Sequence, residues 1–565
     1  MSNSNFNRRQ FLQAALYSSV ALGSGVMPKL VPPAKAAIAA DAKVLVNLFL
    51  DGGPDMRHLI VPEYDPAAPV SSFGRKYWAN RMRSHNLSDT GANGLQTPLQ
   101  RWNDDYFHIT VGGSNWNGSL VDIGSTNAGI TFGIWREAGW LIDMFLSGNV
   151  AMIFNAVGGT NRAHDLSSLM LEQGNLLSGL NDRDRSGWGG RLARSAGGNS
   201  IALTNTPSAF NFGPVGAAPN YDPDAIDNTD LLSIENSRDI GLFDFNPESN
   251  QHYDFNDKMA RAAKSYYAGL RKEQVGTAYL KALDHELKVR EFGDLIAARL
   301  ETVILPDEIQ ALYSNNIGSI NPDPTDTEVP PDGRRVLRSS SFGRQVRNLY
   351  DLISIGDVYV QDQNGIDQLR LGARTLSMSY GGWDSHGNQR RIPAVLANDP
   401  NNPFESRGIE SGLRDIFGGQ LESLASPSDP TALHGGFSAL WKHLPQADLD
   451  KMVLTVAGEF GRQIRDNGDA GTDHGKGNLM MVVCEGCQGG LYGEMFPQSE
   501  IIKYDEPPNR TPDIDPRTEI DHFFANVCDW VVPGSGVSVF PRMSPGYIGE
   551  APIIEMAGMF DNLFV

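Results

Sequence analysis

Residues 452–484 read MVLTVAGEFGRQIRDNGDAGTDHGKGNLMMVVC, and this stretch decides which fold we expect for the chain. An apolar run ends at Ala457 and another begins at Leu479, which predicts two buried strands joined by a loop. Ligands of parallel sheets bind outside the carboxyl ends of strands, and Glu459 and Arg462 would stand at such an end. We therefore predict that the loop forms half of a metal-dependent active site. The loop also carries Asp473, His474 and Lys476.

Three earlier apolar runs are also followed by polar clusters. The runs are Val44–Leu50, Val150–Val157 and Thr375–Tyr380, and each is typical of a buried strand. Buried carboxylates at the edge of a sheet need partners, so we expect the clusters to meet at one edge. Carboxylate and imidazole groups together suit zinc, manganese or iron, and one carboxylate often bridges two ions. The clusters are Asp51 with Asp55, Thr160 with Arg162 and His164, and Asp384 with His386.

Helical patterns alternate with these strands, which predicts an α/β fold with a mainly parallel sheet in one domain, residues 37–565. Two insertions are expected, at about 63–125 and 205–345. The first is predicted to form loops and short hairpins. The second begins with an acidic loop and continues into a helical insertion over Lys258–Leu300. The other helices are expected at Trp135–Leu146, Leu166–Gly174, Ser340–Ile355, Gly408–Leu424, Phe437–His443 and Thr518–Val532.

Charge and cysteine content limit the classes of function. The 565 residues include 47 Lys and Arg against 67 Asp and Glu, a net charge of −20. This balance argues against nucleic acid or an anionic membrane as a partner. The three cysteines are Cys484, Cys487 and Cys528, and no second Cys-x-x-Cys pair accompanies the first, so the chain is not a disulfide-built scaffold. Cys484 is expected to point into the core. A disulfide is an alternative if the protein is exported.

The amino terminus has the pattern of an export signal. Residues 7–13 read NRRQFLQ, an uncharged run follows over Ala14–Met27, and Ala34-Lys35-Ala36 is a small-x-small cleavage pattern. This is typical of a twin-arginine signal peptide over residues 1–36. The alternative, a membrane anchor, is weaker because the run is short and rich in Gly and Ser. We expect a periplasmic or secreted protein without a stable membrane span, exported already folded.

Several motifs occur together in a combination that resembles a known family. Over about residues 1–555 the chain resembles the DUF1501 family of exported bacterial proteins, which are placed among the alkaline-phosphatase-like, or sulfatase-like, α/β hydrolases. The resemblance implies a three-layer sandwich around a central, mostly parallel sheet. The motifs are the signal, the Gly-Gly-x-Asp turn at 52–55, Arg-x-His at 162–164, Gly187-Trp188, Gly-Trp-Asp-x-His at 382–386, Glu-Phe-Gly-Arg at 459–462 and Gly-Thr-Asp-His-Gly at 471–475.

The resemblance also implies a site for one or two divalent ions, zinc first, with manganese or calcium as alternatives. The first strand of the superfamily ends in a metal-binding Asp, which Asp51 matches. The nucleophile opens a helix after the next strand, where Thr160 lies nearest and Ser167 is a poorer match. Asp384 and His386 match an Asp and a His that bind one ion.

Two alignments of the last motifs stay open. In one, Asp473 and His474 are the metal-binding Asp-His pair of the superfamily. In the other, Glu459 takes the strand-end position and His474 is a later, lone ligand. We prefer the second, because Glu459 follows one apolar run and His474 precedes the next. The resulting ligand sets are Asp384, His386 and His474 for one ion, and Asp51, Glu459 and Asp55 for the other.

The function expected from these features is hydrolysis of a phosphate or sulfate ester in a small molecule or a polymer. Arg462 would clamp the oxyanion, and His164 would contact the substrate or lie near the metal. Phe460 stands where the second metal site would have its His, so the second ion would bind weakly or be absent. The alternative is a non-catalytic binding or assembly protein on a degenerate form of the fold, with an oligomer or a protein partner.

Overall fold

The computed structural model describes part of the chain in detail. The expected signal peptide at 1–36 and most of the helical insertion over Lys258–Leu300 lie outside the described residues. Within the described ranges, no helix has the length and apolar content needed to cross a membrane. The described residues are 42–112, 121–123, 129–178, 186–204, 207–213, 231–238, 293, 295–313, 337, 340–361, 367–390, 408–419, 435–507 and 513–564.

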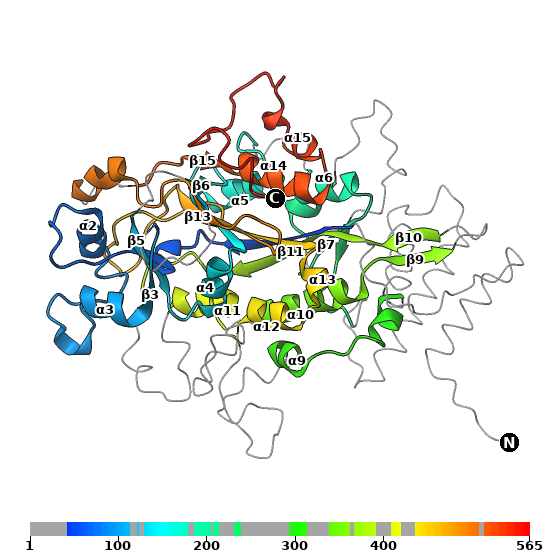
Figure 1. The fold of residues 1–565 in the computed structure, drawn as a ribbon, viewed down its shortest axis with the longest axis horizontal. Helices are drawn as coiled ribbons and strands as arrows, with labels where there is room; N and C mark the ends of the chain where they lie inside the picture. The colour runs from blue at the N-terminus through cyan, green and yellow to red at the C-terminus, as the bar shows by residue number, and fades with distance from the viewer. Residues whose placement is uncertain are drawn as a thin grey trace, which may run out of the picture.

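A ten-stranded sheet runs through the centre of the described part of the molecule (Figure 1). Its order is β4-β14-β6-β13-β12-β1-β11-β7-β8, and β15 pairs with β6. Only β13 runs against its neighbours, β12 and β6, so the prediction of an α/β fold with a mainly parallel sheet is confirmed. The strands are β1 (Val44–Asp51), β4 (Val121–Ile123), β6 (Val150–Val157), β7 (Asn199–Ala202), β8 (Leu231–Ser233), β11 (Ala373–Gly381), β12 (Met452–Ala457), β13 (Asn478–Val483), β14 (Gly490–Tyr492) and β15 (Thr518–Glu519).

The sequence of β1 explains its central place. Every residue of VLVNLFLD is buried except the last, Asp51. The strand pairs in parallel with β11 on one side and β12 on the other. Because successive side chains point to opposite faces, Val46 enters the apolar core on one face of the sheet and Leu45 the core on the other. Apolar residues in both directions therefore suit this strand to the middle of the sheet.

Helices cover both faces of the sheet and give three layers (Figure 1). The aromatic residues Trp140 and Phe437 belong to the core on one face, and Trp188 and Phe524 belong to the core on the other. The helices of the first face are α4 (Gly139–Leu146), α9 (Asp307–Tyr313), α10 (Ser340–Ile355), α11 (Ile409–Phe417), α12 (Gly436–His443) and α13 (Gln446–Leu449). Those of the second face are α5 (His164–Gln173), α6 (Trp188–Ser195), α14 (Ile520–Val531) and α15 (Gly536–Val539).

The segment at 63–125 differs from its prediction as loops and hairpins, because it also contains two helices, α2 (Phe73–Asn80) and α3 (Pro98–Asp105). Thr97 and Gln100 form a capping box around Pro98, which starts α3. Trp78 and Trp102 anchor the two helices in the core. The helices accompany a small antiparallel sheet of β2 (Ile60–Pro62), β5 (Thr131–Trp135) and β3 (Tyr106–Thr110).

Other element boundaries differ by a few residues. Trp135 ends strand β5, so the helix expected at Trp135–Leu146 starts only at Gly139. The helix expected from Gly408 ends at Phe417. The remaining elements are β9 (Val358–Gln361), β10 (Asp367–Leu371), η1 (Met56–His58), η2 (Ala92–Gly94), η3 (Ala209–Asn211), η7 (Gln498–Asp505) and η8 (Pro541–Met543).

The direction of β13 determines which residues reach the edge where a ligand would bind. The carboxyl ends of β1, β6, β11 and β12 share one edge of the sheet. Because β13 is reversed, its amino end lies at this same edge. His474, which precedes Asn478 at the start of β13, is therefore brought to residues that follow the other strands. The reversal of β13 thus brings a residue that precedes a strand together with residues that follow other strands.

Candidate metal centre

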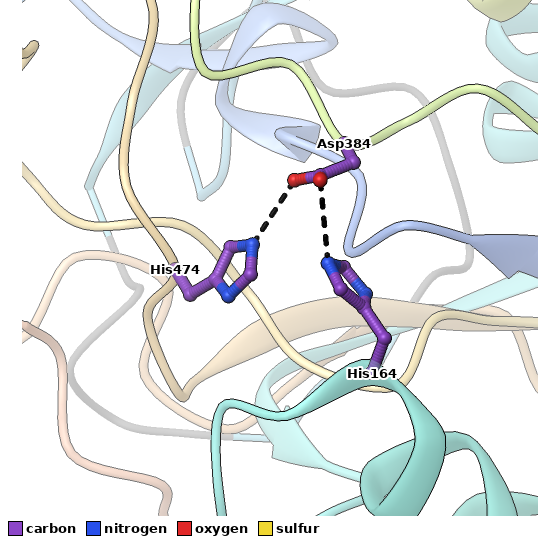
Figure 2. A group of neighbouring side chains, drawn as sticks. All are labelled: His164, Asp384 and His474. Atoms are coloured by element: carbon purple, nitrogen blue, oxygen red, sulfur yellow. Dashed lines mark hydrogen bonds and ion pairs between the residues drawn. The ribbon is translucent and has the colours of Figure 1, made fainter.

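Asp384 lies at the centre of a cluster of imidazoles (Figure 2). It follows β11 by three residues, and its Oδ1 is 3.0 Å from Nε2 of both His386 and His474. Its Oδ2 is 3.4 Å from Nε2 of His164, the first residue of α5. One ligand atom from each of His164, Asp384 and His474 lies within 4.8 Å of the others. Three segments far apart in the chain therefore converge on one point.

In His474 and His386, the nitrogen that points away from Asp384 has a hydrogen-bond acceptor of its own. The Nδ1 of His474 is 2.9 Å from the carbonyl oxygen of Arg162, which only accepts, so Nδ1 carries the proton. The Nδ1 of His386 is 3.2 Å from a carboxylate oxygen of Asp473. In their neutral forms both rings therefore direct the lone pair of Nε2 into the cluster, whereas a protonated His474 donates from Nε2 to Asp384.

Glu459 holds the third imidazole in the same way. Its Oε1 is 2.8 Å from Nδ1 of His164 and also accepts the backbone N–H of Gly52, 2.8 Å away. The glutamate is buried, whereas the His164 side chain is one-third exposed. The Nε2 of His164 has no hydrogen-bond partner among the described residues. A carboxylate behind an imidazole is the arrangement that orients histidine ligands in metal sites.

These nitrogens and oxygens have the spacing of ligands around one small cation. The Nε2 atoms of His386 and His474 are 3.0 Å apart. Two ligands at about 2.0 Å from a tetrahedral zinc ion are about 3.3 Å apart. Neutral imidazole and carboxylate are also the donors that zinc takes in proteins. The residues present therefore fit a divalent cation.

Arg462 connects Asp384 to the loops around the cluster. Its side chain is fully buried, and its guanidinium donates a 2.9 Å hydrogen bond to Oδ1 of Asp384. We expected this arginine to clamp a substrate oxyanion, but the structure directs its donors at the protein itself. It thereby ties the turns after β1 and β11 to its own loop. The backbone carbonyls that accept from it are those of Gly52, Gly53, Trp383 and Thr472.

The turn after β1 requires glycine because it approaches the Asp384 loop closely. Gly52 has a φ of +115°, and a Cβ atom there would lie 2.4 Å from the backbone nitrogen of Asp384. Gly53 has a φ of +62°, and its Cβ would collide with the ring of Phe460. Both glycines therefore allow the strand ends to meet.

The surroundings of Asp384 favour its charged form. Partial burial works to raise the pKa of this carboxyl, but hydrogen bonds from His474 and Arg462 hold its pKa well below the usual range. The group is therefore an anion at neutral pH and suits a cation ligand.

Phe460 forms an apolar wall behind two of the imidazoles. Its ring centroid is 5.0 Å from that of His164 and 4.6 Å from that of His474, and the side chain is fully buried. Phe460 follows Glu459, at the position where a second metal site was expected to have its histidine. On this side the cluster is closed by carbon atoms.

The residues expected at a second ion have different partners in the structure. Asp55 is buried in an ion pair with Arg81 and accepts a 3.1 Å hydrogen bond from the Thr472 hydroxyl. Glu459 binds His164, as described above. Asp51 lines a neighbouring cavity, where burial and the charge of Glu459 raise its pKa to about 6.

The expected nucleophile has no base beside it among the described residues. The hydroxyl of Thr160 is 3.5 Å from the sulfur of Met170. The hydroxyl of Ser167 is buried and donates a 2.9 Å hydrogen bond to the carbonyl of Asn161. Neither hydroxyl is placed against the His164–Asp384–His474 group by a hydrogen bond.

One supporting residue was missed from the sequence. Gln389 is buried, and its amide nitrogen donates to the hydroxyls of Ser385 and Thr472 at 2.9 and 2.8 Å. It holds the loop after β11 against the loop before β13. No sequence signal marks this glutamine, because its role depends on two loops 83 residues apart meeting in space.

The three cysteines are free thiols and are buried, as expected for Cys484.

Comparison with known proteins gives one match. Residues 419–504 match the model of DUF1501, a family described as a protein of unknown function. The matched segment includes Glu459, Arg462, Asp473 and His474. Searches of the curated proteins and of the solved structures each returned no match.

Proposed function

We propose that this protein is an exported, metal-dependent hydrolase of phosphate or sulfate esters, built on an alkaline-phosphatase-like fold and carrying a cleaved twin-arginine signal. One observation carries the proposal. Nε2 atoms of His386 and His474 lie 3.0 Å from Asp384 Oδ1, and Nε2 of His164 lies 3.4 Å from Oδ2. A divalent cation would neutralise the lone pairs that the three imidazoles and the carboxylate bring together.

Four side chains would hold the ion, namely His164, Asp384, His386 and His474. A divalent cation bound there supplies Lewis-acid chemistry and lowers the pKa of water. Glu459 and Asp473 keep the Nδ1 protons of His164 and His386 in place, so these carboxylates position ligands. The proposal assigns zinc first, with manganese or calcium as alternatives.

Arg162 is the cation that the proposal assigns to the ester oxygens, because Arg462 is committed to backbone carbonyls. The carbonyl of Arg162 accepts the Nδ1 proton of His474, which places this residue beside the cluster. Its guanidinium is one-third exposed and pairs with Asp513 at 3.0 Å. The planar guanidinium of an arginine can donate two parallel hydrogen bonds to the oxygens of a phosphate or sulfate group.

Water is the nucleophile that the geometry favours. The Thr160 hydroxyl faces the Met170 sulfur and is not hydrogen-bonded to a base among the described residues, so it lacks the activation that a covalent route requires. The open side of the cluster is at His386 and Asp384, whose side chains are both 46% exposed. Water reaches the cluster from that side, and the buried Phe460 excludes it from the other.

The test combines metal analysis with turnover. The mature chain, residues 37–565, is purified after export and its bound metal is measured by inductively coupled plasma mass spectrometry. Hydrolysis of an aryl phosphate, an aryl phosphodiester and an aryl sulfate is measured with and without a chelator. We expect one of these activities, dependent on metal and lost in His474→Ala.

The matched control is His443→Ala. His443 lies at the end of α12 and pairs with Glu308 at 2.9 Å, outside the cluster. It should keep both metal and activity. A wild-type protein with no stoichiometric metal and no ester hydrolysis would contradict the proposal, and a defined oligomer or co-purifying partner would then favour the binding or assembly alternative.

A further inference from the structure

We propose that a cavity beside the metal centre binds a sugar ring, the alcohol part of the ester, so that the substrates are carbohydrate phosphates or sulfates. The inference rests on the proposed function and adds the substrate class to it. The cavity has a volume of about 300 Å³ and lies against β1, β11, α5 and α10. This volume is at the lower end of the range for small-molecule sites.

The cavity opens at the same edge of the sheet as the metal centre. Asp51, the last residue of β1, lines it, and so does Ser379, which pairs with Phe49 in the register of β1 and β11. The carbonyl of Asp51 accepts a 3.2 Å hydrogen bond from the backbone nitrogen of Trp383, the residue before Asp384. Glu459, which binds His164, is close enough to Asp51 to raise its pKa. A ligand in the cavity would therefore be adjacent to the metal ligands.

The lining has both polar and apolar parts, as a sugar ring does. Phe49, Leu203 and Met378 supply apolar surface. Hydroxyl and carboxyl groups, such as those of Ser379 and Asp51, supply hydrogen-bonding atoms around it. A ring with CH groups on its face and hydroxyls on its rim matches both kinds of surface. A purely apolar alcohol would leave the polar groups without partners.

The charges of the cavity favour a neutral ligand part over the anionic part of the ester. Three carboxyl groups line it, and the one basic residue on its wall, Arg344, already pairs with Glu235 at 3.1 Å. Burial raises the pKa of Glu172 to about 7. A carboxyl group that titrates near neutrality both donates to and accepts from hydroxyls. The phosphate or sulfate would thus lie at the metal and Arg162, with the sugar in the cavity.

The test measures sugar binding separately from turnover. Saturation-transfer NMR with the methyl glycosides of glucose, galactose, mannose and N-acetylglucosamine is recorded on the full mature protein without metal. At least one glycoside should give a signal. Ser341→Trp places a large side chain in the cavity from an exposed position at the start of α10, and it should abolish that signal. Ser195→Trp, at an exposed position of α6 that does not line the cavity, should leave it unchanged.

The turnover arm uses the metal-loaded enzyme. In Ser341→Trp, kcat/KM for a hexose phosphate or sulfate should fall at least tenfold more than kcat/KM for the aryl ester, and in Ser195→Trp neither value should change. Aryl ester hydrolysis without binding of any glycoside would overturn this inference and leave the proposed function standing. Glycoside binding without any ester hydrolysis would contradict the proposed function and support the cavity's assignment. Equal glycoside signals in wild type and Ser341→Trp, or stronger binding of ethanolamine than of every glycoside, would overturn the inference.

Discussion

The Nε2 atoms of His386 and His474 lie 3.0 Å apart, although 88 positions separate the two residues in the chain. Each ring has a hydrogen-bond acceptor at Nδ1, Asp473 for one and the Arg162 carbonyl for the other. In the neutral rings two lone pairs would therefore face each other next to Asp384, and a cation between them, as proposed, would relieve their repulsion.

Glu459→Gln should weaken metal binding about 10- to 100-fold, the usual effect of changing the carboxylate behind a ligating histidine. An amide holds the Nδ1 proton of His164 less strongly than the buried carboxylate does. Zinc affinity is measured by competition with a chromophoric chelator. Glu235→Gln, which alters an exposed carboxylate paired with Arg344, is the control. Equal affinities in wild type and Glu459→Gln would refute this role.

Arg462→Met should lower the free energy of unfolding by about 3 kcal/mol or more, because several buried carbonyls and Asp384 would lose their donor. Urea unfolding followed by circular dichroism measures the change. Arg344→Met removes a guanidinium that is about one-third exposed, and it should cost no more than about 1 kcal/mol. Similar losses in the two variants would contradict the organising role of Arg462.

Phe460→His tests whether the apolar wall limits the site to one ion. The centroid of the Phe460 ring lies 5.0 Å from that of His164 and 4.6 Å from that of His474, so an imidazole there would add a nitrogen ligand beside both rings. We expect the wild type to bind one zinc ion per chain and the variant to approach two by mass spectrometry of the native protein. Phe460→Leu should stay at one. Two ions in the wild type would show that the wall does not exclude the second.

The raised pKa of Asp51 predicts how stability depends on pH. Its pKa is about 6 in the folded protein and 3.8 in an ordinary setting, so between these values the folded state binds the proton more strongly. The contribution of Asp51 to stability is therefore present at low pH and is lost as pH rises from about 4 towards 6. Asp51→Asn should remove this decline from the urea midpoints measured across that range. Asp104→Asn, at an exposed position of α3, should preserve it.

Thr160→Ala should keep at least half of the wild-type kcat, since the threonine hydroxyl faces the Met170 sulfur and water is the assigned nucleophile. Steady-state assays with the preferred aryl ester give kcat. A loss of a thousandfold or more, or a phosphorylated Thr160 trapped in the wild type, would return the nucleophile to Thr160.

Four strand ends were predicted from the sequence because each follows a local apolar run. Val150–Val157 is a strand with the predicted bounds, and Ser340–Ile355 is a helix with the predicted bounds. The helices at 63–125 were missed although Thr97, Pro98 and Gln100 carry a capping signal and α3 is amphipathic, because the Gly, Asn and Ser residues around them predicted loops. Local patterns therefore located most elements near the site.

The partners of the charged residues were not predictable in the same way. Asp51, Asp55 and Glu459 were assigned to one ion by the preferred alignment with the superfamily that the chain resembles. The structure gives them three different surroundings: a cavity, an ion pair with Arg81 and a hydrogen bond to His164. A carboxylate interacts with whichever group lies within a few ångströms, and that neighbour comes from a distant part of the chain.

The sequence by itself determined that this is an α/β chain with polar clusters after its buried strands, because apolar runs and strand ends are properties of neighbouring residues. Only the tertiary structure decided that β13 is reversed and that its amino end meets the carboxyl ends of the other strands. Strand direction depends on pairing between segments, and that pairing brings His474 to Asp384.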